Sequence, residues 1–254
     1  MANFESVVPL WSYDIAALVV FFALYRLFRD RPERSKRSLL WALCAINLVA
    51  YLINDYYFLK RGDNILTMLP LQLCNMAVFL VPLALGFRKR ILNDFVFYVC
   101  ALGAIAALIV PSSDYIGQTY SLMTASFFVF HFIIVLVPFL LAAWGLYRPN
   151  PTPRSVTMLS LAVFASAAVL HVFNIALNRL LGIEADYFFT VIRFSAPRNP
   201  AFALFASIVP YDLFYLLPAL PILWVYMFLI SLPWNWRAWF LRGRPATAGS
   251  KGNK

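Results

Sequence analysis

A cysteine and a histidine, Cys74 and His131, lie in two different apolar segments, each about six residues inside the boundary that charge counting places on the outer side. At a helical rise of about 1.5 Å per residue, each is on the order of 9 Å below that boundary. An imidazole beside a thiol can take its proton and generate the nucleophile of covalent catalysis. We therefore expect Cys74 as nucleophile and His131 as general base. Cys44 and Cys100 are expected to pack as small hydrophobic residues.

The segments that hold this pair belong to a chain that is apolar throughout. Hydrophobic residues make up 63% of the sequence, and the mean hydropathy is +0.76. Runs of roughly 20 apolar residues, enough to cross about 30 Å of hydrocarbon as a helix, recur along it without the alternation typical of β-barrel strands. We predict an all-α polytopic membrane bundle of seven transmembrane helices, at about residues 10–28, 38–59, 69–87, 91–111, 125–147, 156–181 and 209–234.

The basic residues predict the orientation of the bundle. When the connecting loops alternate between the two sides, 16 of the 21 Lys and Arg residues fall on one side, and the other side keeps Lys60, Arg61, Arg179, Arg193 and Arg198. The positive-inside rule then places the N-terminus outside and the C-terminus in the cytoplasm. The formal charge of +10 suits anionic headgroups of the inner leaflet as partners, and its distribution argues against nucleic acid.

We expect one folded domain, the seven-helix transmembrane domain of residues 1–241. Residues 242–254 are expected to form a disordered cytoplasmic tail, because they are rich in Gly, Ala, Ser and Lys. The proline-rich segment Arg148–Arg154 predicts a stiff cytoplasmic turn. The outer connection from about Gly182 to Ile208 is too apolar for a free loop, and we expect it to form a cap over the outer end of the bundle.

Most polar side chains inside the predicted helices lie in their outer halves. Because a polar group in hydrocarbon costs free energy, this bias predicts a polar cavity there. Spacings of three and four put His171, Asn174 and Asn178 on one helical face. For each Asn, and for His131, the structural alternative is a hydrogen bond to a neighbouring helix. The residues expected to bind substrate or stabilise an oxyanion are Asp55, Gln72, Asn75, His171, Asn174, Asn178 and Asp212.

Several short stretches, taken in order, carry a resemblance to a known family. They are Leu69–Cys74, Phe127–His131, and Asn174–Asn178 followed by Asp186–Phe189. From about residue 40 to residue 230 the chain is similar to the YwaF family of bacterial integral membrane proteins and its eukaryotic relative, transmembrane protein 164. Pro197 and Pro210 fit the proline expected before the last span. The chain departs from the family pattern at Gln72, where the family usually has His, and at Asp186, where it usually has Asn.

The resemblance implies thiol-dependent acyl transfer on glycerophospholipids, with membrane lipids as substrates and a bacterial cell membrane as the location. Our leading hypothesis is a phospholipid acyltransferase or transacylase, or a lipase if water is the acceptor, with no cofactor. The alternatives are a transporter or binding protein for a small polar or lipidic solute, and a non-catalytic assembly partner. We expect no metal, although a site made of both histidines with Asp55 or Asp212 is an open alternative.

Overall fold

The computed structural model describes residues 10–111, 115, 120–197 and 200–240. This part of the chain is helical and contains no strand, which confirms the all-α fold class. The long elements are α2 (Trp11–Phe28), α3 (Glu33–Arg61), α4 (Leu73–Phe87), the continuous run α5 (Arg90–Asp94), η3 (Phe95–Cys100) and α6 (Ala101–Ile109), then α7 (Leu122–Ala143), α8 (Pro153–Leu180) and α11 (Ala219–Phe240). The predicted tail, residues 242–254, lies outside the described residues.

Six helices in the described part are long and apolar enough to cross a membrane, so the chain is an integral membrane protein. They are Trp11–Phe28, Glu33–Arg61, Arg90–Ile109, Leu122–Ala143, Pro153–Leu180 and Phe214–Trp236. The predicted segment at 69–87 differs, because its helix α4 has only 15 residues and spans about 22 Å at the helical rise. The number of seven spans and the orientation of the termini therefore stay predictions.

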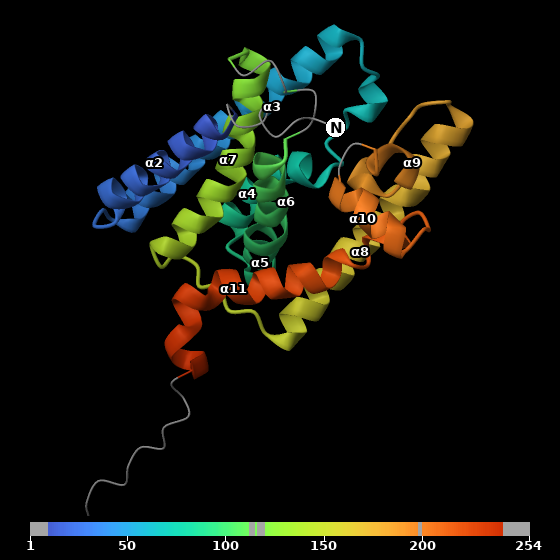
Figure 1. The fold of residues 1–254 in the computed structure, drawn as a ribbon. Coiled ribbons are helices and arrows are strands. Elements are labelled where there is room, and N and C mark those ends of the chain that lie inside the picture. Colours follow the sequence, from blue (N-terminus) through green and yellow to red (C-terminus); the bar gives the residue numbers. More distant parts are fainter. Residues whose placement is uncertain (1–9, 112–114, 116–119, 198–199, 241–254) are drawn as a thin grey trace, which may run out of the picture.

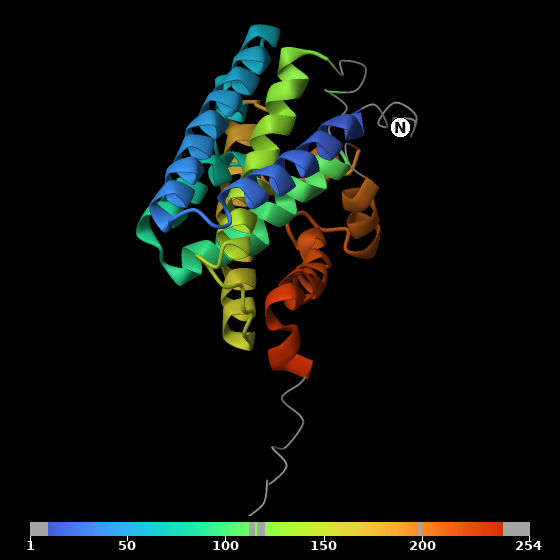
Figure 2. The ribbon, with the colours of Figure 1, turned by 90° about the vertical axis from the view of Figure 1, so that its left-hand side faces the viewer.

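Helix α7 is the central helix of the part of the bundle that α2 to α7 form. It packs against α2, α3, α4 and α6, and most of its side chains are buried. Helix α2 lies across it (Figure 2), where the Tyr13 ring stacks on Phe128 at a centroid distance of 4.7 Å. Figure 1 shows α4 and α6 between α7 on one side and α8 to α10 on the other.

Buried hydrogen bonds tie the last helix to the rest of the bundle. The hydroxyl groups of Tyr98, in the π-helical element η3, and of Ser231, in α11, lie 2.7 Å apart, and both side chains are fully buried. The Trp224 indole of α11 donates to Ser160 of α8 at 2.8 Å. Because an unpaired polar group is costly in an apolar interior, these bonds fix how α11 sits on the bundle.

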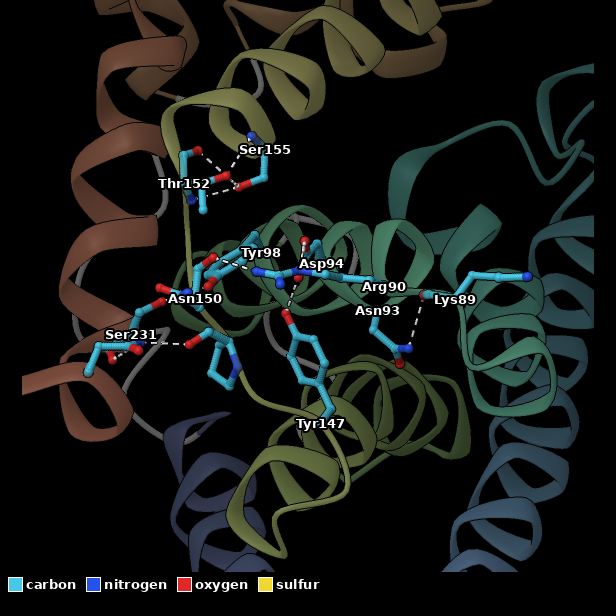
Figure 3. Close-up of polar contacts among 12 residues, drawn as sticks. Lys89, Arg90, Asn93, Asp94, Tyr98, Tyr147, Asn150, Thr152, Ser155 and Ser231 are labelled. Carbon is cyan, nitrogen blue, oxygen red and sulfur yellow. Dashed lines mark hydrogen bonds and ion pairs between the residues drawn. The ribbon is translucent and has the colours of Figure 1, made fainter. Parts of the chain in front are cut away.

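The proline-rich segment Arg148–Arg154 is non-helical as far as Thr152, but the prediction was wrong for its last two residues, which begin α8. Helix α7 ends at Ala143, and α8 begins at Pro153, a position that proline favours because the missing N–H has no partner there. Thr152 and Ser155 form a capping box in which each side-chain oxygen accepts from the other residue's backbone N–H (Figure 3). The capping box therefore starts α8 at a defined residue.

The outer connection folds into short helices. They are η5 (Tyr187–Phe189), α9 (Ile192–Ser195) and α10 (Pro200–Ile208), and η6 (Phe214–Leu216) follows them. Element η5 packs against α8. This packing is consistent with the expected cap. Most of the connection is helical rather than irregular.

We predict that the Ser231→Ala substitution destabilises the protein, because it removes a hydrogen bond of the buried Tyr98 hydroxyl, at a cost of about 1 kcal/mol. Thermal unfolding in detergent should show a lower Tm. Ser207→Ala is the matched control, since Ser207 is exposed and bonds only within its own helix. Equal Tm values for the two variants would contradict the structural role of the Tyr98–Ser231 bond.

Candidate functional site

Three side chains of α8 hold the backbone of the outer connection. The Asn178 amide accepts from Ala185 N at 2.8 Å and donates to Ala185 O at 3.0 Å. The Asn174 amide accepts from Tyr187 N and donates to Tyr187 O, both at 2.9 Å. One ring nitrogen of His171 lies 3.1 Å from Thr190 Oγ1. The residues predicted to share a helical face therefore do act together, and their common partner is the segment 185–190.

Gln72 reaches the same segment from the residue before α4. Its amide donates to Asp186 O and accepts from Phe188 N, each at 2.9 Å. We call Gln72, His171, Asn174 and Asn178, together with the segment 185–190, the outer clamp. The two positions at which the chain departs from the family pattern, Gln72 and Asp186, are thus direct hydrogen-bonding neighbours.

Further bonds fix the residues on both sides of the clamped segment. The carboxylate of Asp186 accepts from Val191 N at 2.9 Å and from the Ser195 hydroxyl. The Tyr187 hydroxyl donates to Leu66 O at 2.6 Å and accepts from Leu69 N at 3.0 Å. The Tyr187 bonds link the clamp to the turns before α4. Leu66 and Leu69 therefore hold the chain in place just before α4 begins.

The clamped backbone has an unusual conformation. Phe188 and Phe189 have φ values of 58° and 54°, in the left-handed region that bulky residues avoid. Such residues cost of order 1–3 kcal/mol each and persist where the surroundings over-determine them, often at functional sites. The hydrogen bonds of the outer clamp supply that constraint here.

Cys74 lies two residues beyond Gln72, as the second residue of α4. All three cysteines are free, but Cys44 and Cys100 are buried, whereas Cys74 is partly buried. A Cβ placed on Gly103 would be 3.8 Å from the Cys74 sulfur and 3.0 Å from Leu73 Cδ2. The absence of a side chain at Gly103 therefore lets α6 approach the start of α4 closely.

His131 is buried in α7 between the rings of Phe127 and Phe130, whose centroids lie 4.2 and 3.9 Å from its own. Its Nδ1 lies 2.9 Å from Phe127 O. Since a carbonyl can only accept, Nδ1 carries the proton, and Nε2 of the neutral ring is the free base. Within the described residues no hydrogen bond joins His131 to Cys74, so the structure brings the two helices together without joining these side chains.

The other predicted site residues are placed as follows. Asn75 is partly buried, and its side chain makes no hydrogen bond within the described part of the chain. Asp212 is exposed and accepts from Ile192 N at 2.8 Å. Asp55 is partly buried beside Tyr51 in α3. Among the described residues there is no group of three His, Cys, Asp or Glu side chains that could hold a metal ion.

Two members of this site were not predicted from the sequence. Tyr187 and Thr190 are buried and bond to Asn174, and the Tyr187 hydroxyl also reaches the turns before α4. Tyr187 stands in the stretch Asp186–Phe189 that carries the family resemblance, which was the one available signal. Thr190 had no such signal, because a single threonine in an apolar loop carries no chemical pattern.

We predict that Asn174→Ala lowers the Tm strongly. The substitution leaves the backbone N–H and C=O of buried Tyr187 unpaired, and each unsatisfied group costs about 1–3 kcal/mol. Asn75→Ala is the control, because the Asn75 side chain makes no hydrogen bond within the described residues. The Tm of this variant should stay close to that of the wild type. An unchanged Tm in Asn174→Ala would contradict the clamp.

Comparison with known proteins places this architecture in a family. The TMEM164 family matches residues 2–232, which is most of the chain. No curated protein and no solved structure matches the sequence. Because this match covers most of the chain, the chain belongs to the TMEM164 family of membrane proteins.

Proposed function

We propose that this protein transfers acyl chains between phospholipids, with Cys74 as the nucleophile. The observation that carries the proposal is the position of Cys74, which is the partly buried cysteine of the three and stands two residues after Gln72, a member of the outer clamp. A nucleophile at the start of a helix, with its preceding backbone fixed, is held in place before the substrate arrives. The acyl chains of a lipid substrate stay in the membrane while the ester reaches the sulfur.

The reaction has two balanced steps. In the first, the Cys74 sulfur attacks the ester carbonyl, His131 Nε2 takes the thiol proton, and the lysophospholipid oxygen leaves with that proton, so that a thioester forms. In the second, the hydroxyl of a lysophospholipid acceptor attacks the thioester and gives its proton to His131. His131 returns the proton to the Cys74 sulfur. Because the two side chains are not hydrogen-bonded in the described structure, the mechanism requires them to approach when substrate binds.

Asn75 is our proposed donor to the tetrahedral oxyanion. The amides of Gln72, Asn174 and Asn178 are already bonded to the backbone of the outer clamp. Asn75 is next to Cys74 in sequence, and its amide is not bonded within the described residues. We therefore assign the clamp amides to positioning and the Asn75 amide to the oxyanion.

The first test uses purified protein in nanodiscs with a phospholipid labelled in its acyl chain and an unlabelled lysophospholipid. We expect Cys74→Ala and His131→Ala to abolish acyl transfer. Cys44→Ala, which removes a buried thiol, should keep it. Trapping of labelled acyl chain on the wild type, released by hydroxylamine, should report the thioester. Full transfer by Cys74→Ala would contradict the mechanism, and solute flux that survives this substitution, without transfer, would favour a transporter.

The second test concerns the oxyanion. A good oxyanion donor contributes about 3 kcal/mol to the transition state, so Asn75→Ala should lower kcat by about 100-fold. The KM for the donor lipid should change little, because the charge forms only in the transition state. An Asn75→Ala variant with wild-type kcat would exclude this role.

A further inference from the structure

A cavity of about 290 Å³ lies at the opposite end of the bundle from the outer clamp. It is formed where α3 and α5 begin and where α4 and α7 end, and its lining includes Arg37, Arg88, Arg90 and Arg148, with Leu85 and Leu141 among its apolar residues. We call it the arginine pocket. The charge distribution predicts that this end of the bundle faces the cytoplasm.

The four guanidinium groups are only partly neutralised. Arg37 pairs with Glu33 at 2.6 Å, and Arg90 lies 3.5 Å from Asp94. Figure 3 shows Asp94 between Arg90 and Tyr147, whose hydroxyl donates to the same carboxylate. Arg88 and Arg148 form no ion pair within the described part of the chain. The pocket therefore keeps an excess of positive charge.

Arg90 and Arg148 also donate hydrogen bonds to backbone carbonyl groups, but these bonds use only some of their N–H donors. Arg90 donates to Asn150 O at 2.9 Å (Figure 3), and Arg148 donates to Trp234 O at 3.1 Å. Both acceptors are uncharged backbone carbonyls, and a guanidinium has five N–H donors. The bonds hold the arginines in place while most of their donors can still bind an anion.

The surroundings of the pocket fit a lipid. Leu85 and Leu141 are buried in the core, whereas Phe87, directly before Arg88, is 64% exposed and Trp41 is 47% exposed. Exposed aromatic and aliphatic side chains beside arginines are typical of the membrane interface. The volume, about 290 Å³, is just below the range for small-molecule sites, about 300–1,000 Å³, so the pocket has room for one headgroup while the acyl chains lie along the exposed apolar surface.

We propose that the arginine pocket binds the phosphate group of an anionic phospholipid. Guanidinium groups bind phosphate oxygens through paired, charge-assisted hydrogen bonds. A headgroup that carries an ammonium would place a positive charge among the arginines, so phosphatidylglycerol is preferred to phosphatidylcholine. The proposal is independent of acyl transfer, because the pocket and Cys74 lie at opposite ends of α4.

The test measures lipid binding to the full chain in detergent by native mass spectrometry. We expect phosphatidylglycerol to bind at least 10-fold more tightly than phosphatidylcholine. Arg88→Gln, at an exposed residue without an ion pair in the described structure, should reduce this binding at least 10-fold, and the Arg88→Gln/Arg148→Gln double variant should reduce it further. Arg34→Gln is the control for overall charge, since Arg34 is exposed on the same side and does not line the pocket.

The source of the phosphate is tested separately. Inorganic phosphate should protect the protein against thermal unfolding far less than phosphatidylglycerol does, and equal protection would overturn the lipid assignment. Undiminished phosphatidylglycerol binding by Arg88→Gln would overturn the site. Cys74→Ala should bind phosphatidylglycerol as the wild type does, so that a failure of the acyl-transfer mechanism is distinguishable from a failure of this proposal.

Discussion

The hydrogen bonds of Asn174, Asn178 and Gln72 to the backbone of residues 185–188 are the interaction on which this end of the helical bundle depends. Backbone that leaves the helical conformation close to the hydrocarbon needs partners within the protein. These amides supply both donors and acceptors, and they hold Phe188 and Phe189 in a left-handed conformation. They also join α8 to the residue before α4, and so fix where α4 begins.

Most of the long helices were predictable from the sequence, because continuous apolar runs leave a membrane chain few other ways to satisfy its backbone. The last helix, α11, begins at Ala219 rather than near residue 209 as predicted. The sequence also placed His171, Asn174 and Asn178 on one face, which follows from helical periodicity alone. It did not predict the start of α4 at Leu73. Gln72 is extended because it bonds to residues 186 and 188, more than 100 positions away, and a long-range contact of this kind leaves no periodic pattern.

Helix α4 connects two different chemical environments. Its second residue is Cys74, beside the outer clamp, and the residue after its last turn is Arg88, in the arginine pocket. A helix of 15 residues is shorter than the hydrocarbon thickness, so polar groups at both ends can lie within reach of lipid ester and lipid phosphate. The proposed acyl transfer and the proposed headgroup site lie at these two ends and do not depend on each other.

Hydrogen–deuterium exchange of the protein in nanodiscs tests the outer clamp most directly. The amide hydrogens of Ala185, Tyr187 and Phe188 are bonded to side chains of Asn178, Asn174 and Gln72. They should exchange as slowly as amides inside helices, and Asn174→Ala should release Tyr187 first. Fast exchange of all three in the wild type, as in a solvated loop, would contradict the account.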